Sequence, residues 1–269
     1  MNSPQRAGLI HAFFAERAVA KIPEGKATPR DIASIGVIGG GTMGSGIATA
    51  ALMAGLPVTL IERDAAAMDK TAATITGNLD GAVERGKMNA AERDTILNDH
   101  LTLASDLSTL SQADLIIEAV FEDMEVKKDI FSRLDSLAKP GAILASNTSF
   151  LDIDQIAAMT DRPADVRGLH FFSPAHFMRL LEVVVGAKTD AGVVATGFAL
   201  AKKLRKVGVR AGVCDGFIGN RILAHYRKVA DYLVMDGASP WQVDTALEAF
   251  GFAMGPFAVS DLAGLDIGW

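Results

Sequence analysis

The stretch SIGVIGGGTMGSGIATAALMAGLPVTLIE, residues 34–62, has the pattern of a strand, a tight turn, a helix and a second strand. Three of its glycines, at 39, 41 and 44, fit G-x-G-x-x-G directly after the first apolar run. Gly39 would allow the tight turn, Gly41 a close backbone approach to a pyrophosphate, and Gly44 close packing of the helix on the strand. The stretch therefore predicts a dinucleotide-binding turn at the start of a Rossmann-type sheet.

The residues around this turn complete the expected site. Thr42 and Met43 open the predicted helix, whose free N–H groups would face the phosphates of a dinucleotide. Glu62 closes the second strand, 18 residues beyond Gly44, where a carboxylate binds the adenosine ribose hydroxyls and would repel a 2′-phosphate. This position favours NAD over NADP, although Arg63 beside it keeps the choice open. The alternative is a surface glutamate next to a glycine turn that serves packing alone.

The composition excludes several classes of protein. A chain of 269 residues, 49% of them apolar, can bury a sizeable core in one large domain or two ordinary ones. A formal net charge of −6 argues against a nucleic-acid partner, because phosphate contacts need a basic surface. No apolar run reaches the roughly 18 residues of a membrane span. With the single Cys214 no intrachain disulfide can form, and no metal site is expected.

Apolar runs alternate with amphipathic stretches from residue 34 onward. This alternation predicts the α/β class, with βαβ units, a parallel sheet and helices on both of its faces. The strand candidates are 34–39, 57–62, 101–104, 113–120, 142–147, 166–172 and 180–185. The longest amphipathic stretches between them are 64–86, 124–138 and 190–206.

The chain changes character near residues 213–216, where the strand signals stop. Helices are expected over 217–236, 240–250 and about 256–265, separated by glycine and proline. This last part is small for an independent core, so we expect a domain that is incomplete. The expected division is 1–30 for a linker helix and linker, 31–214 for the dinucleotide-binding domain, and 215–269 for the helical domain.

A histidine and a glutamate interrupt the apolar pattern of GLHFFSPAHFMRLLEV, residues 168–183. His170 ends one apolar run and Glu182 lies within the next, at positions where a strand would otherwise be hydrophobic. A buried carboxylate is destabilising unless a partner compensates it, and a carboxylate-oriented imidazole is a common general base. A purely structural pair is the alternative.

Other polar residues follow the ends of predicted strands, where ligands bind in open α/β sheets. Ser149 would be placed to donate to a substrate oxygen, or it caps the next helix. Glu122 and Lys127 would contact the nicotinamide ribose, or they are ordinary charges in the first turn of a helix. Asn220 would reach an interdomain cleft, or it is a satisfied amide between helices.

Taken together, these motifs resemble the L-3-hydroxyacyl-CoA dehydrogenase family over residues 34–269. Several long motifs in one order are far more specific than the glycine motif alone. The resemblance rests on VIGGGTMGSGIA, EAVFEDMEVKK, SNTSF, GLHFFSPAHFMRLLEV, GFIGNRI and FGFAMGPFAVSDLAGLD.

The resemblance implies an NAD-dependent oxidation of L-3-hydroxyacyl-CoA to 3-ketoacyl-CoA in fatty-acid β-oxidation. His170 would be the catalytic base and Glu182 its partner, with Ser149 and Asn220 at the reacting part of the substrate. The implied cofactor contacts are Gly39, Gly41, Thr42, Met43, Gly44, Glu62, Glu122, Lys127, Ser149 and Ser173. Arg85 and Lys87 are weaker candidates for the CoA phosphates, and a solvated helix face is the alternative for each.

One residue departs from the family pattern. Many members read FFNP where this chain reads FFSP, which puts Ser173 in place of a cofactor-contacting asparagine. The FFSP form is closer to the peroxisomal-type bifunctional branch, in which an enoyl-CoA hydratase domain precedes the dehydrogenase. HAFFAERAVAKIP, residues 11–23, is similar to that junction. We therefore expect the chain to be part of a multifunctional enzyme, with a hydratase domain as its partner.

Two rival functions stay open at this point. Another β-hydroxy acid dehydrogenase would share the cofactor domain, although such enzymes more often use a lysine base. An NAD-binding module with little turnover is the other rival, since the helical tail is short. We expect a cytoplasmic protein, or a peroxisomal one in a eukaryote, and a homodimer is one further expectation.

Overall fold

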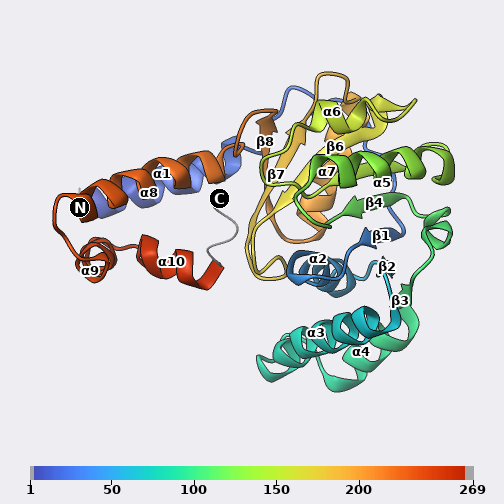
Figure 1. Ribbon diagram of the computed structural model, residues 1–269, viewed down its shortest axis with the longest axis horizontal. Helices are drawn as coiled ribbons and strands as arrows, with labels where there is room; N and C mark the ends of the chain where they lie inside the picture. The colour runs from blue at the N-terminus through green and yellow to red at the C-terminus, as the bar shows by residue number, and fades with distance from the viewer. Residues whose placement is uncertain (1–2, 264–269) are drawn as a thin grey trace. The chain divides into compact units, whose positions relative to one another are not determined.

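The computed structural model describes residues 3–263 and divides the chain into two compact units after Phe217. The first unit is built on an eight-stranded sheet of order β3-β2-β1-β4-β5-β6-β7-β8 (Figure 1). The strands are β1 Ile35–Ile38, β2 Val58–Ile61, β3 Leu101–Ala104, β4 Leu115–Glu118, β5 Ile143–Ser146, β6 Val166–Phe171, β7 Leu180–Val185 and β8 Val207–Gly212.

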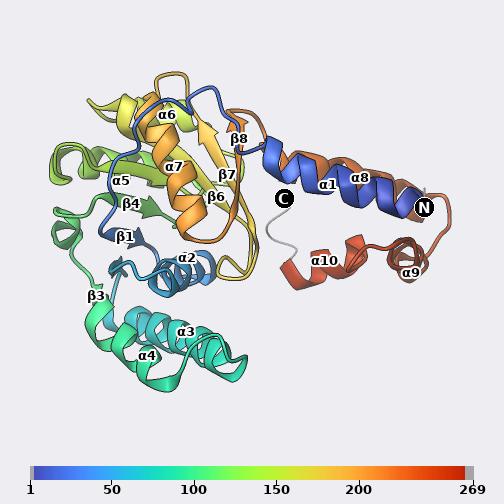
Figure 2. The ribbon, with the colours of Figure 1, turned by 180° about the vertical axis from the view of Figure 1, so that it is seen from behind.

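Helices cover both faces of this sheet, and each face has its own apolar core. On one face α2, α3 and α7 pack on the sheet, and on the other face α5 and α6 do so (Figure 2). The α-helices of the first unit are α1 Pro4–Ala18, α2 Thr42–Met53, α3 Ala65–Glu84, α4 Ala90–Thr95, α5 Met124–Leu137, α6 Ile153–Ala157 and α7 Ala191–Lys203. Short helical turns are η1 Ile96–His100, η2 Leu107–Leu110 and η3 Pro163–Asp165. The Rossmann-type α/β fold expected from the sequence is therefore confirmed.

The sheet differs from the sequence expectation in two places. β7 runs antiparallel to β6, within a sheet that is otherwise parallel as the alternating pattern predicted. The connection of residues 172–179 is too short for the crossover that a parallel pair needs. The sequence reading also missed β8, which pairs parallel with β7. As a mostly half-exposed edge strand with two glycines and an arginine, β8 lacks the apolar run of a buried strand.

The order of the strands reverses direction at β1. Its neighbours β2 and β4 run parallel to it, but the chain moves outward to β3 on one side and to β5 on the other. This reversal of direction is a topological switch point, where ligands bind beyond the carboxyl ends of the strands. The glycine turn after β1 and the loops after β4 and β5 all lie at this edge.

Arg167 is an unexpected buried cation under helix α7. Its side chain is 1% exposed, Nη1 donates to the carbonyl oxygen of Val193 at 2.5 Å, and Nε and Nη2 have no hydrogen-bond partner among the described residues. Burial lowers the pKa of Arg167 to about 9. Gly197 gives the guanidinium its space, because a Cβ there would overlap the guanidinium.

This overlap predicts that Gly197→Ala lowers the free energy of unfolding when Arg167 is present and raises it when Arg167 is replaced. In the native chain the added methyl group meets the guanidinium, so Gly197→Ala should lower the free energy of unfolding. In an Arg167→Met background the same change should raise it by up to about 1 kcal/mol, the helix preference of alanine over glycine. Urea denaturation of the four variants measures both effects. Destabilisation in both backgrounds would contradict the assigned overlap.

Asp114 ties the amino end of β4 to its surroundings. Its carboxylate accepts hydrogen bonds from the Lys139 ammonium at 2.6 Å and from the backbone N–H groups of Ala33 and Ser34. Burial raises the pKa of Asp114, but the ammonium and these N–H groups outweigh burial and leave the pKa below its usual value. The ionised carboxylate therefore stabilises the fold, and protonation removes that stabilisation.

The lowered pKa predicts how an Asp114→Asn variant responds to acid. At neutral pH the variant should unfold at lower urea than the native chain, because the stabilising carboxylate is gone. The difference in urea midpoint should begin to narrow as the pH falls below about 4, where Asp114 of the unfolded native chain becomes protonated, and should close only as the pH falls through the lowered pKa of the folded chain. The urea midpoints of the variant and the native chain, compared at neutral and acidic pH, measure this difference. A difference that does not change with pH would contradict the stabilising role of the ionised Asp114 carboxylate.

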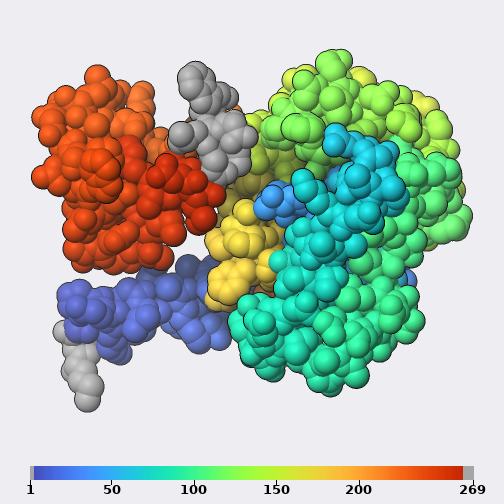
Figure 3. Space-filling model, turned by 60° about the horizontal axis from the view of Figure 1, so that its bottom comes forward, coloured from blue at the N-terminus to red at the C-terminus, as the bar shows by residue number. Residues whose placement is uncertain are grey.

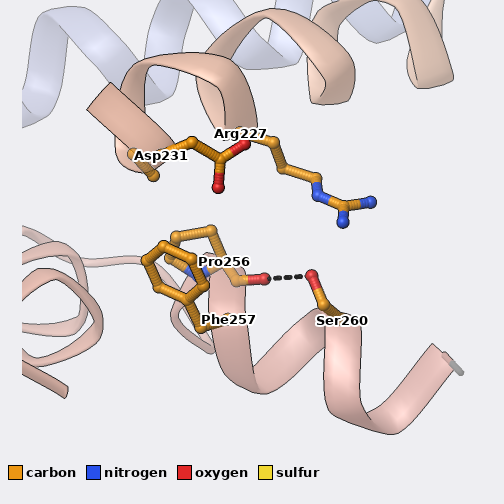
Figure 4. Close-up of a pocket in the computed structure, with 6 residues that line it drawn as sticks. Arg227, Asp231, Pro256, Phe257 and Ser260 are labelled. Carbon is orange, nitrogen blue, oxygen red and sulfur yellow. Dashed lines mark hydrogen bonds between the residues drawn. The ribbon is translucent and has the colours of Figure 1, made fainter. Parts of the chain in front are cut away.

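The second unit consists of helices in its described part. They are α8 Gly219–Met235, α9 Pro240–Phe250 and α10 Pro256–Ala263, close to the expected ranges. The end of the third expected helix, 264 and 265, lies outside the described residues. Asp244 fixes the start of α10 by accepting from the N–H groups of Phe257 and Ala258. A small pocket between α8 and α10 is lined in part by Arg227 and Ser260 (Figure 4).

Candidate active site

The glycine turn after β1 has the geometry that a dinucleotide needs. Gly39 adopts a φ of 91°, and a Cβ at Gly44 would overlap the carbonyl oxygen of Gly39, so helix and turn approach too closely for any side chain. A Cβ at Gly41 would meet nothing within 4 Å. No side chain caps the start of α2, so its first N–H groups have no side-chain acceptor. Open space at Gly41 and uncapped N–H donors together suit a pyrophosphate.

Glu62 stands beside this turn, as the motif predicts. One carboxylate oxygen accepts from the N–H of Gly40 at 2.7 Å and the other from the N–H of Arg63 at 3.0 Å. These bonds hold the carboxylate in place at the edge of the site, where its side chain is half-buried. The site thus carries a fixed negative charge, the feature that favours ribose hydroxyls over a 2′-phosphate.

His170 and Glu182 form a buried pair across two strands. The antiparallel register of β6 and β7 sets the two residues directly opposite each other. Nδ1 of His170 lies 2.7 Å from Oε2 of Glu182, and the residues are 3% and 0% exposed. Since side chains alternate between faces of a sheet, this register places both on the face that α5 and α6 cover. The contact at Nδ1 leaves Nε2 as the nitrogen that can exchange a proton with a ligand.

Two aromatic rings flank the imidazole. The ring centroid of Phe172 is 4.5 Å from that of His170, and the centroid of Phe217 is 5.6 Å away. Phe217 is buried, and its φ of 46° is rare for a residue with a large side chain. It follows Gly216, whose φ is 65°. The sequence reading missed both rings, because phenylalanine in an apolar run carries no signal of its own.

Glu122 organises the loop after β5. Its Oε1 accepts from the Thr148 hydroxyl at 2.5 Å and from the N–H groups of Ser149 at 2.7 Å and Phe150 at 3.1 Å. Glu122 precedes α5 rather than lying in its first turn, and Asp152, not Ser149, caps α6. The alternative roles considered for Glu122 and Ser149 are therefore wrong.

Lys127 is buried between two carboxylates. Its ammonium is 2.7 Å from Glu118 and 3.4 Å from Glu122, and its side chain is 1% exposed. Lys127 does lie at the start of α5, as the alternative had it, but it is a buried ion-pair partner rather than an ordinary helix charge. The sequence reading missed Glu118, because it treated the residue as part of the β4 strand run.

Basic side chains gather around the turn that follows Ser173. The ammonium of Lys206 donates to the carbonyl oxygens of Ala175 and Met178, both at 2.6 Å, and burial lowers its pKa to about 8. Burial and then the positive charges of Arg85, Lys206 and Lys87 lower the pKa of His176. In Figure 3 the yellow surface around this turn lies beside the cyan surface of α3. The two CoA candidates from the sequence thus share a surface with two basic residues that the sequence reading missed.

The remaining candidates are placed as follows. Ser173 is exposed and joined to Pro174 by a cis peptide bond. Asn220 lies in the second unit, in the first turn of α8, and is half-exposed. Their roles stay predictions. Among residues 3–263, no cluster of metal-ligating side chains is found, and no helix of that part is long and apolar enough to cross a membrane.

Comparisons with known proteins identify the family. Residues 34–214 match the family described as 3-hydroxyacyl-CoA dehydrogenase, NAD binding domain, and residues 216–269 match its C-terminal domain. The peroxisomal bifunctional enzyme of Cavia porcellus is 44% identical over all of this chain, which spans 38% of that enzyme's length.

Solved structures agree with the sequence matches. FadB2 of M. tuberculosis superposes with a TM-score of 0.85 at 41% identity, over 88% of this chain and 84% of that one. The 3-hydroxybutyryl-CoA dehydrogenase of Escherichia coli gives a TM-score of 0.82 at 39% identity, over 88% of this chain and 51% of its own. The cofactor of the glycine turn is accordingly NAD. The chain belongs to the 3-hydroxyacyl-CoA dehydrogenase family.

Proposed function

We propose that the chain oxidises the 3-hydroxyl group of an L-3-hydroxyacyl-CoA to a ketone, with NAD as the oxidant, as the dehydrogenase part of a multifunctional β-oxidation enzyme. The buried pair of His170 and Glu182 carries this proposal, because an oriented base is what the removal of a hydroxyl proton requires. NAD, when bound, supplies the acceptor for the hydride from C3 of the substrate.

Different side chains deprotonate and orient the 3-hydroxyl group of the substrate. Nε2 of His170 takes the hydroxyl proton, while Glu182 holds the other ring nitrogen and stabilises the positive charge that develops on the imidazole. Ser149, fixed through its backbone by Glu122, orients the substrate oxygen together with Asn220. A positioned base contributes about 10²- to 10⁴-fold in rate.

The remaining roles concern the two large ligands. The glycine turn, Glu62, Glu122, Lys127 and Ser173 bind NAD, and Arg85 and Lys87 attract the phosphates of CoA. An enoyl-CoA hydratase domain of the same multifunctional enzyme supplies the 3-hydroxyacyl-CoA. The relatives named peroxisomal support a peroxisomal enzyme in a eukaryote, and we propose the cytoplasm in a bacterium.

The direct test is NADH formation by the 269-residue chain. L-3-hydroxybutyryl-CoA and a longer L-3-hydroxyacyl-CoA should both yield NADH, whereas the D-isomers should not. Replacing NAD by NADP should lower the rate, because Glu62 repels the 2′-phosphate. Tight NAD binding without any NADH formation would overturn the proposed activity and favour a binding module.

A further inference from the structure

Glu118 is a fully buried carboxylate to which the proposed reaction assigns no step. It ends β4 and is 0% exposed. A buried carboxylate destabilises a protein unless hydrogen bonds and a counter-charge compensate it. What Glu118 contacts therefore indicates what it does.

Both oxygens of Glu118 have partners. Oε1 accepts from the Lys127 ammonium at 2.7 Å and from the N–H of Val120 at 2.8 Å. Oε2 accepts from the hydroxyl of Ser146 at 2.6 Å. One carboxylate thus joins the ends of β4 and β5 to helix α5.

These contacts continue toward the proposed substrate site. The ammonium of Lys127 also lies 3.4 Å from Glu122, which holds the Thr148 hydroxyl and the N–H groups of Ser149 and Phe150. A continuous line of charge-assisted contacts therefore runs from Glu118 to the loop that carries Ser149. Such contacts are stronger and more directional than neutral hydrogen bonds.

The two residues after Glu118 lie against the cofactor turn. A Cβ at Gly39 would lie 2.9 Å from the carbonyl oxygen of Ala119 and 3.1 Å from the side chain of Val120. The peptide between Ala119 and Val120, whose N–H donates to Glu118, thus packs directly against Gly39 of the glycine turn. Because β1 and β4 are neighbours at the switch point, Glu118 stands between the NAD turn and the Ser149 loop.

We infer that Glu118 is a positioning residue that holds the Ser149 loop in register with the NAD turn, through Lys127 and Glu122. Its kinetic consequence rests on the proposed function. Misplacement of a reacting group by about 1 Å lowers rates by about 10²-fold, so a loosened Ser149 loop should affect kcat more than KM.

A matched control exists on the same strand. Asp114 at the other end of β4 also pairs with a lysine, Lys139, and accepts backbone N–H groups. Asp114→Asn therefore removes a comparable carboxylate far from the carboxyl edge of the sheet. If Glu118 serves stability alone, Glu118→Gln and Asp114→Asn should behave alike.

The test compares the two variants in hydrogen exchange and kinetics. Glu118→Gln should speed amide exchange in residues 147–151 and lower kcat by about tenfold to 10²-fold, with a smaller change in KM. The deuterium isotope effect on kcat should rise, because hydride transfer becomes slower relative to product release. Asp114→Asn should lower the melting temperature but leave exchange in 147–151 and kcat unchanged.

Each outcome decides for or against the positioning role. The positioning role would be overturned if Glu118→Gln kept the amide exchange rates of 147–151 and the kcat of the native chain. It would also be overturned if Asp114→Asn changed both quantities as much as Glu118→Gln does. If Glu118→Gln does not fold, Glu118→Gln with Lys127→Met leaves no buried charge unpaired, and it should fold with exchange in 147–151 still raised. Native protection and kcat in that double variant would also overturn the inference. If the native chain forms no NADH, the proposed activity fails, while the exchange comparison still tests Glu118.

Discussion

Replacing His170 by glutamine is expected to lower kcat by about 10²- to 10⁴-fold with little change in NAD affinity. Glutamine is close to histidine in size and keeps a polar group near Glu182, but it cannot take the substrate proton. Among the residues that the structure describes, the carboxylates of Glu62, Glu118 and Glu122 at this edge already accept hydrogen bonds, so none of the three stands ready to replace His170 as the base. Initial rates of NADH formation measure the loss, and calorimetry measures NAD binding.

A companion variant separates the base from its orienting partner. Glu182→Gln keeps a contact to Nδ1 but removes the negative charge that stabilises the imidazolium, so its kcat should lie between native and His170→Gln. Because the two residues act as a unit, the double variant should be no worse than His170→Gln alone. Native activity in His170→Gln would refute the proposed base.

Replacing Gly44 by alanine is expected to abolish measurable NAD binding and to lower the free energy of unfolding by about 1–3 kcal/mol. The new methyl group would overlap the carbonyl oxygen of Gly39, so helix α2 must move away from the turn. The phosphate-binding N–H groups move with it. Calorimetry with NAD and urea denaturation check the two effects.

Gly77 supplies the control for this change. It lies within α3, and a Cβ there would meet nothing within 4 Å. Gly77→Ala should therefore keep native NAD affinity and gain up to about 1 kcal/mol from helix preference. Gly44→Ala binding NAD as tightly as Gly77→Ala would show that the turn tolerates a side chain, contrary to the assigned packing.

Local patterns predicted most of the first unit, because each buried strand is a short apolar run bounded by turn residues. Strands 101–104 and 180–185 have the predicted bounds, and the others differ by one or two residues at their ends. The direction of β7 was not predicted, because an apolar run carries no information about its partner strand. That information lies only in the length of the 172–179 connection, because so short a connection excludes the crossover that a parallel pair needs.

The sequence predicted those parts of the candidate site that a local motif marks. The dinucleotide turn follows from glycine spacing, and a polar residue in an apolar run drew attention to His170 and Glu182. Glu118 meets the same criterion, yet it was read as strand, because its partners Lys127 and Ser146 come from other elements. The grouping of His176 and Lys206 with Arg85 likewise depends on tertiary contacts that no local pattern contains.

The pairing of His170 with Glu182 has a consequence for recognising distant relatives. The 11 residues between them include a connection whose length the strand register does not fix. A homologue with a longer or shorter turn would keep the same facing side chains at a different spacing. A search for fixed spacing would overlook such a homologue, whereas a search for histidine and glutamate on adjacent antiparallel strands would find it.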